Sequence, residues 1–168
     1  MFEILLIIGG ALMRLVPHLP NFTPIAGMAL FGGVFLKKRY ALIIPLAAML
    51  VSDFFIGFHS LMPYVYGSFV LSGLIGLWLR SHKNVFTIVS ATFLSSVLFF
   101  LITNFGVWAE GMYARNLSGL LESYMMAIPF FRNTVLGDLF YTGVFFGAYE
   151  LAMMLNLKFK MSKVKTTR

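Results

Sequence analysis

Residues 85–108 read VFTIVSATFLSSVLFFLITNFGVW, a stretch of 24 residues that contains no Asp, Glu, Lys or Arg. A helix that crosses the roughly 30 Å hydrocarbon core of a bilayer needs about 20 predominantly apolar residues. The stretch is long enough to do so, and it therefore predicts a membrane-spanning helix. It also identifies lipid as the solvent in which the rest of the chain has to fold.

The rest of the chain has the same character. Of the 168 residues 60% are hydrophobic and 11% are charged, and the mean hydropathy is +0.88. A soluble domain is about 45–50% apolar and about 25% charged, so this chain cannot cover a water-facing surface. The opening residues MFEILLIIGG lack a basic n-region and an A-x-A cleavage site, and we interpret them as a retained helix rather than a signal peptide.

Working outward from residues 85–108, the apolar runs predict an all-α integral membrane protein, a bundle of six transmembrane helices in a single domain covering residues 1–168. The predicted helices are Phe2–Val16, Pro24–Leu36, Tyr40–Gly57, Leu61–Leu79, Val85–Trp108 and Arg132–Leu157. The first two cover only roughly 20–23 Å at about 1.5 Å per residue. We expect them to thin the bilayer or to line a cavity, and we expect Arg14–Pro24 between them to dip into an outward-facing cavity.

The basic residues gather in three clusters, and each cluster follows an even-numbered predicted helix. The clusters are Lys37–Arg39, then Arg80 with Lys83, and then Lys158, Lys160, Lys163, Lys165 and Arg168. Cytoplasmic loops carry an excess of Lys and Arg, so the pattern predicts that both termini are cytoplasmic. The net charge of +7 is thereby explained without nucleic acid. The C-terminal cluster has two interpretations: it anchors the chain at anionic headgroups, or it is a tail that binds a polyanion.

The connector Ala109–Phe131 carries a helical pattern of its own. Apolar residues follow one face of a helix at Leu117, Leu120, Leu121, Tyr124, Met125 and Ile128. Asn116 or Ser118 is suited to cap its start. We expect a short interfacial helix across the outer surface, and its role as an anchor or as a lid stays open.

Polar side chains concentrate near the predicted outer ends of the helices. A charge inside the membrane costs at least about 2.5–3.5 kcal/mol, so it should be paired or line a cavity. We expect Arg14 to pair with Asp53 or with Asp138, either as a structural ion pair or beside a ligand. Polar groups next to aromatic surface suit an amphipathic small molecule. The candidate ligand-binding residues are Arg14, His18, Asn21, Asp53, His59, Tyr66, Asn104, Trp108, Asn133, Asp138 and Tyr141.

The proline-rich connector RLVPHLPNFTP offers structural reasons for most of its polar residues. Thr23 is suited to be the N-cap of the second helix, with Pro24 at the first helical position. Asn21 favours a turn. His18 has no such reason, and His18 and His59 are the weak candidates for a metal or cobalt site, although a lone histidine is more often a hydrogen-bonded residue than a ligand.

The sequence contains no catalytic motif. It lacks H-E-x-x-H, G-x-S-x-G, a P-loop and any cysteine, which excludes disulfides and thiolate metal sites. We therefore do not expect an enzyme, and energy for pumping has to come from partner subunits or an ion gradient. Small residues four apart, at Ala29/Gly33 and Gly143/Gly147, allow a neighbouring helix to approach closely.

Four strings carry a resemblance to a known family: RLVPHLPNFTPIAGMALFGG, AMLVSDFFIGFH, TNFGVW and AIPFFRNTVLGDLFY. They resemble a family of small bacterial membrane transport proteins that is similar to the substrate-binding (S) components of energy-coupling factor (ECF) vitamin transporters. The resemblance covers residues 10–148. It implies a six-helix protein of the bacterial cytoplasmic (inner) membrane that binds a vitamin-like molecule from outside, alone or docked on a scaffold with two ATPase subunits.

Cobalamin is one candidate for the bound vitamin, as substrate rather than as cofactor. Some solitary cobalamin S components ligate cobalt with a cysteine, which this chain lacks. His18 or His59 would have to replace it, or cobalt is not ligated. The expected function is therefore small-molecule binding for uptake. The alternatives are an accessory or scaffold subunit without its own ligand and, third, an intramembrane enzyme using Asp53, Asp138 or the histidines.

Overall fold

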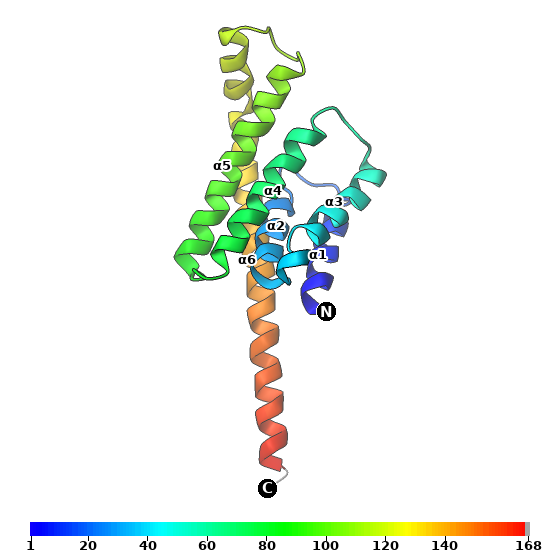
Figure 1. Cartoon of the computed structure of the whole chain (residues 1–168), viewed down its shortest axis with the longest axis vertical. Coiled ribbons are helices and arrows are strands. Elements are labelled where there is room, and N and C mark those ends of the chain that lie inside the picture. The colour runs from blue at the N-terminus through cyan, green and yellow to red at the C-terminus, as the bar shows by residue number, and fades with distance from the viewer. Residues whose placement is uncertain (167–168) are drawn as a thin grey trace.

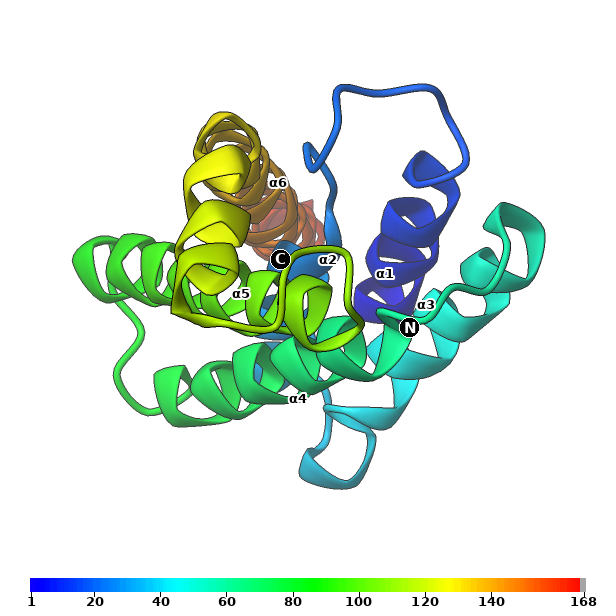
Figure 2. The same cartoon turned by 90° about the horizontal axis from the view of Figure 1, so that it is seen from above.

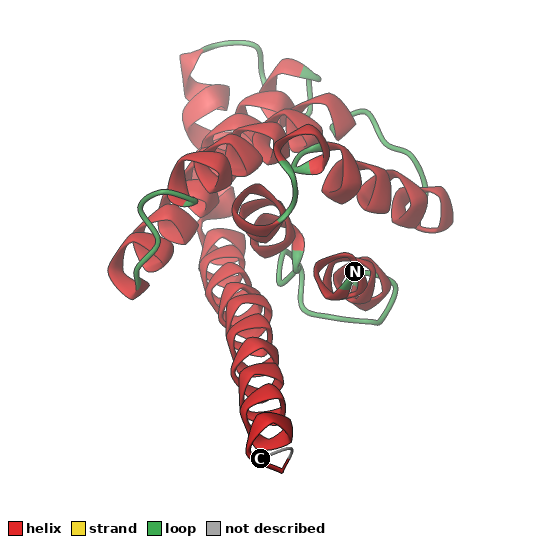
Figure 3. Ribbon diagram, turned by 60° about the horizontal axis from the view of Figure 1, so that its bottom comes forward, coloured by secondary structure: helices red, strands yellow, loops and turns green. Residues whose placement is uncertain are grey.

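The computed structural model describes residues 1–166, and the side chains of residues 1–156. This part of the chain forms six α-helices, one short 3-10 helix and no strand, which confirms the predicted all-α class (Figures 1 and 3). The helices are α1 (Phe2–Met13), α2 (Ile25–Phe35), η1 (Lys38–Tyr40), α3 (Ile43–Ile56), α4 (Met62–Leu79), α5 (Val85–Ala109) and α6 (Leu117–Thr166).

Helix α2 lies at the centre of the bundle, with the other helices around it (Figure 2). Residues Ile25–Val34 are all buried. A helix that is apolar on every side has no face to turn toward water, so its neighbours have to cover it completely. The rings of Phe31 and Phe35 pack against Phe146 and Tyr149 of α6, with ring centroids 4.0–5.8 Å apart.

Helices α2 and α4 cross at glycines. A Cβ atom added to Gly33 would lie 2.6 Å from the carbonyl oxygen of Gly73 and 2.6 Å from the Cα atom of Gly76. Small residues allow helix backbones to approach this closely. One predicted small-residue pair therefore contributes Gly33 to a helix interface. The other pair, Gly143 and Gly147, does not, because a Cβ atom added to either has no neighbour within 4 Å.

Among the residues that the structure describes, three segments are long and apolar enough to cross a membrane, judged by length and composition: Lys38–Ile56, α4 and α5. Large apolar side chains such as Phe54, Phe55 and Phe86 are exposed, as expected where a helix faces lipid. These features indicate a membrane protein. Helices α1 and α2 have only 12 and 11 residues, roughly 18 Å and 17 Å at about 1.5 Å per residue. The six full transmembrane spans expected from the sequence are therefore not confirmed.

Helix α6 differs most from the prediction. It runs unbroken through 50 residues, whereas the sequence suggested a separate interfacial helix followed by a span at Arg132–Leu157. Pro129 lies inside the helix, and proline is tolerated where neighbouring helices support the backbone. The hydroxyl of Tyr124 donates a 2.9 Å hydrogen bond to the carbonyl of Leu101 on α5. The interfacial helix is thus corrected to the first turns of α6, which form a hairpin with α5 at the top of Figure 1.

The two predicted helix caps have different outcomes. At the start of α6, Oδ1 of Asn116 accepts a 2.9 Å hydrogen bond from the backbone N–H of Gly119, as predicted. Thr23 does not cap α2, because the helix begins at Ile25 and its N-cap residue is Pro24. No side-chain hydrogen bond caps this helix. A Cβ atom added to Gly137 of α6 would lie 3.1 Å from the backbone nitrogen of Thr23. The connector therefore packs closely on α6 directly before α2 begins.

The connectors α2–α3 and α4–α5 lie at one end of the bundle, called here the basic end. Nη2 of Arg80 donates to the carbonyl of Gly33 at 2.7 Å and to the carbonyl of Leu36, at the C-terminus of α2. Nζ of Lys83 lies 2.6 Å from Oε1 of Glu150 on α6. Cations near the last carbonyls of a helix are favourable, so Arg80 stabilises the C-terminus of α2.

Two of the three predicted basic clusters, Lys37–Arg39 and Arg80 with Lys83, therefore lie at the same end. The side chains of the third, Lys158–Arg168, lie outside the described residues. The connectors α1–α2, α3–α4 and α5–α6 are at the opposite end, called here the cavity end (Figure 1).

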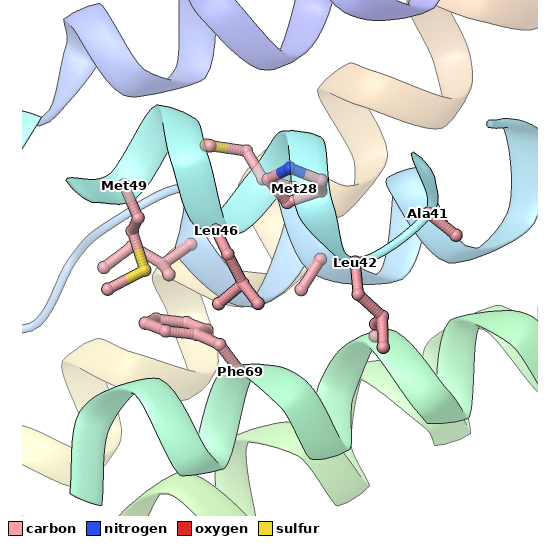
Figure 4. A pocket seen from close by; sticks show the side chains of 10 residues that line it. Met28, Ala41, Leu42, Leu46, Met49 and Phe69 are labelled. Atoms are coloured by element: carbon pink, nitrogen blue, oxygen red, sulfur yellow. The ribbon is translucent and has the colours of Figure 1, made fainter. Parts of the chain in front are cut away.

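A small apolar gap lies where α2, α3 and α4 meet (Figure 4). Its volume is about 10 Å³, and its lining includes Met28, Leu46, Met49 and Phe69. A space of this size would hold about one water molecule, and an apolar lining offers that water no partners. The gap is therefore a packing defect and not a binding site.

Candidate functional site

Arg14 follows the last residue of α1, and its guanidinium group reaches α3. Nη2 lies 2.6 Å from Oδ1 of Asp53, and Nη1 donates to the carbonyl of Met49 at 3.2 Å and to the hydroxyl of Ser52. The phenol of Tyr66 on α4 donates to Oδ2 of Asp53 at 2.6 Å. The predicted pairing of Arg14 with a buried acid is confirmed, and the partner is Asp53.

In this network the carboxylate of Asp53 is paired at both oxygens and largely buried. The side chains of Arg14 and Asp53 are 10% and 5% exposed, and both carboxylate oxygens accept hydrogen bonds. A buried ion pair is tolerated only when its remaining polar atoms also find partners. The three groups join α1, α3 and α4 across two connectors. The geometry favours the structural reading of Arg14, Asp53 and Tyr66 over a ligand-binding one.

A separate cavity lies at the cavity end of the bundle. This wide cavity has a volume of about 290 Å³. Its lining includes Asn21, His59, Thr103, Asn104, Thr134, Phe99, Phe100, Phe130 and Phe131. A deep cavity of about 90 Å³ adjoins it, since the two share Asn21, Phe99 and Thr134, and it reaches Asp138. The two together are called here the polar cavity.

Two helical faces bring these side chains together. On α5, Phe100 and Asn104 are four residues apart, and on α6, Thr134 and Asp138 have the same spacing. Residues four apart lie one above the other on a helix. Nδ2 of Asn104 donates to the carbonyl of Phe100 at 2.7 Å, which fixes the amide at the cavity wall.

Asn21 lies in the wall of both cavities with an unusual backbone. Its φ of +61° is the only positive value of a non-glycine residue in the described part of the chain. Asparagine tolerates the left-handed region better than most residues do. Backbone strain of this kind is found preferentially at binding sites, where the surrounding structure holds it in place.

Three other predicted site residues support the scaffold instead. Nε1 of Trp108 donates to the carbonyl of Ala114 at 3.0 Å and so closes the α5–α6 connector. Nδ2 of Asn133 donates to the carbonyl of Pro20 at 3.1 Å and ties α6 to the α1–α2 connector. Tyr141 is buried in the core, below the lining of the polar cavity.

The two predicted metal candidates lie in different surroundings. His18 is exposed, and its Nδ1 lies 2.6 Å from the carbonyl oxygen of Val16, a local contact that the sequence did not suggest. His59 lines the wide cavity. Within the described residues no group of three or more His, Cys, Asp or Glu side chains is placed to hold a metal ion. A metal site at these histidines stays a prediction.

The sequence reasoning missed the aromatic part of the lining. Phe99, Phe100 and Phe131 resemble any lipid-facing phenylalanine in a chain that has 19 of them. Their spacing from polar residues is the signal that could have found them, because Phe100 precedes Asn104 by four residues and Phe131 precedes Thr134 by three.

Comparisons with known proteins give one finding. No curated protein matches the chain, and no solved structure does. A family model with the description "Family of unknown function (DUF6580)" matches residues 1–162, which include all of the polar cavity. Nothing in these comparisons concerns transport. Because the match covers nearly the whole chain, the protein belongs to the DUF6580 family of unknown function.

Proposed function

We propose that this membrane protein binds a small molecule for uptake, at the polar cavity. The observation that carries the proposal is a cavity of about 290 Å³ in which a few polar side chains converge beside several phenylalanine rings. Small-molecule sites are concave and mostly apolar, with a few placed polar groups, and have volumes of about 300–1,000 Å³. The wide cavity has this composition, and its volume is close to the lower limit of this size range.

The position of the cavity supports an outward-facing site. It lies at the end opposite the basic connectors, and basic connectors are enriched on the cytoplasmic side of membranes. The hydroxyl of Tyr149 donates to Oε1 of Glu3 at 3.5 Å, so α1 begins near the basic end. With this orientation both termini are cytoplasmic, and the polar cavity opens away from the cytoplasm in a bacterial inner membrane.

An S component of an ECF transporter is the transport role that we propose. These 168 residues contain no P-loop, so energy for uptake would come from scaffold and ATPase subunits or from a gradient. The volume of the wide cavity favours a ligand much smaller than cobalamin. The absence of cysteine and the different surroundings of His18 and His59 also speak against cobalt ligation.

Filling the cavity tests the proposal. Ala127 is buried and lines the wide cavity, so Ala127→Trp should occlude it and lower the fraction of ligand-bearing protein about tenfold. The measurement is native mass spectrometry of protein extracted gently from its own membrane. Leu121→Trp, at an exposed position of α6, is the matched control and should keep the wild-type occupancy.

Two results would contradict the proposal. One is wild-type protein that carries no bound mass and binds no member of a panel of vitamins. The other is Ala127→Trp protein that carries the same mass at the same occupancy, because the ligand would then lie outside the polar cavity.

A second function, an accessory subunit without its own ligand, is favoured by one observation. Gly143 and Gly147 are exposed on α6, and a Cβ atom added to either meets no atom within 4 Å. Small residues four apart allow a second membrane helix to pack closely. Isolation from native membranes separates the two functions, since a stable complex without ATPase subunits and without a bound ligand supports the accessory role.

A further inference from the structure

Within the described part of the chain, Asp138 is a buried acid without a cation beside it. The residue is 3% exposed, and Oδ2 accepts a 2.6 Å hydrogen bond from the hydroxyl of Ser96 on α5. Arg14, one of the two partners considered from the sequence, is paired with Asp53 instead. Among the described side chains no Lys, Arg or His forms a salt bridge with Asp138.

The buried polar groups on the neighbouring turns of α5 and α6 are hydroxyls. They are Thr92, Ser95, Ser96, Thr134 and Thr142. The hydroxyl of Thr92 donates to that of Thr142 at 3.3 Å, and Oγ of Ser95 has no hydrogen-bond partner in the described structure. Arg132, six residues before Asp138 on α6, is exposed. Hydroxyls donate hydrogen bonds to a carboxylate but do not neutralise its charge.

The deep cavity provides space beside Asp138 for a positively charged group. It is lined by Asp138 and by the rings of Phe69 and Phe99, whose centroids lie 6.2 Å apart. The wide cavity adds Phe100 and Phe131, with ring centroids 4.8 Å apart. A cation is attracted to aromatic faces, and a carboxyl group removed from water stays charged only when it is paired. Both features of the wall therefore select the same kind of ligand.

We infer that the ligand of the polar cavity carries a positively charged nitrogen, as a protonated amine or an amidinium group, on a small apolar or aromatic body. The nitrogen pairs with the carboxylate of Asp138 in the deep cavity, and the body lies against the phenyl rings of the wide cavity. An anionic ligand would meet a like charge there. The inference rests on the proposed binding function and adds the substrate class.

A series of probes with one shape and three charges tests this inference. Benzylammonium, benzyl alcohol and benzoate are titrated into the purified full-length protein in detergent, and binding is followed by calorimetry and by the midpoint of thermal unfolding. Benzylammonium should bind saturably and at least about tenfold more tightly than the other two. Asp138→Asn should lower its affinity at least about tenfold. Glu122→Gln removes the same charge from an exposed position of α6 and should leave the affinity unchanged.

The outcomes test the preference for a cationic ligand separately from small-molecule binding itself. Equal or tighter binding of benzyl alcohol or benzoate, or no loss in Asp138→Asn, overturns the charge selection and leaves small-molecule binding standing. Absence of benzylammonium binding also overturns it, and the native mass spectrum with Ala127→Trp then decides the binding function separately. If Asp138→Asn does not fold, the ranking of the three probes on the wild-type protein decides.

Discussion

Arg14→Met is expected to lower the free energy of unfolding by about 3–5 kcal/mol, because it leaves the carboxylate of Asp53 buried without its cation. The guanidinium group supplies the hydrogen bonds to Oδ1 of Asp53, to Ser52 and to the carbonyl of Met49. A methionine can fill part of the space but donates no hydrogen bond. The loss should appear as a lower midpoint in the chemical unfolding of the protein in detergent micelles, followed by circular dichroism.

An exposed ion pair at the basic end gives the matched control. Lys83 and Glu150 lie 2.6 Å apart, the same distance as Arg14 and Asp53, but their side chains are 36% and 49% exposed. Exposed pairs contribute about 0–1 kcal/mol, so Lys83→Met should change the unfolding free energy by no more than that. The charged atoms are equally far apart in the two pairs, so the contrast compares a buried, hydrogen-bonded pair with an exposed one.

A double variant that removes both members of the buried pair tests whether the loss in Arg14→Met comes from the unpaired carboxylate of Asp53. Arg14→Met combined with Asp53→Leu takes away both charges and should recover most of the stability that Arg14→Met loses, since apolar residues often replace a buried pair without cost. The phenol of Tyr66 then loses its acceptor, so recovery should be incomplete. If Arg14→Met is no less stable than Lys83→Met, the ion pair does not hold α1 and α3 together and the structural reading is wrong.

The helix positions were largely predictable, because polar residues, prolines and glycines interrupt the apolar runs. The stretch Val85–Trp108 is bounded by Asn84 and Glu110, and α5 ends one residue beyond it. Asn84 forms a capping box with Thr87 there, a local interaction that depends on neighbouring residues only. Helix α6 was not predictable in the same way. Pro129 normally marks a helix end, but α6 continues through it, and its packing against α5 and α2 is tertiary information that the local sequence does not contain.

The candidate site was predictable in composition but not in grouping. Depth along each helix follows from the rise per residue, so Arg14, Asp53 and Asp138 could be placed at similar depths. Which acid meets the arginine depends on the rotation and the neighbours of each helix, and these are set by packing. The structure pairs Asp53 with Arg14 and Tyr66, and it puts Asp138 on a cavity wall. The residues predicted to form one ligand site therefore belong to two places. Arg14, Asp53 and Tyr66 form a structural network, and Asp138 lies in the polar cavity.

Gly33→Ala is expected to destabilise the protein by about 3 kcal/mol, at the upper end of the range for overpacked cores. The added methyl group would lie 2.6 Å from the carbonyl oxygen of Gly73 and from atoms of Gly76, which are backbone atoms that cannot rotate away. Helices α2 and α4 would have to separate. Because α2 also contributes Ile25 and Ala26 to the deep cavity, the same change should weaken ligand binding.

Gly147→Ala on α6 adds the same methyl group where no heavy atom lies within 4 Å. There the change should be neutral or should stabilise by up to about 1 kcal/mol, since alanine is the better helix former. The two variants differ only in what the new methyl group meets, so their unfolding midpoints compare steric contact directly. A Gly33→Ala protein that unfolds at the same denaturant concentration as Gly147→Ala would show that α2 and α4 do not cross at these glycines. A lower midpoint for Gly147→Ala than for the wild type would instead indicate that a partner helix packs on that face of α6.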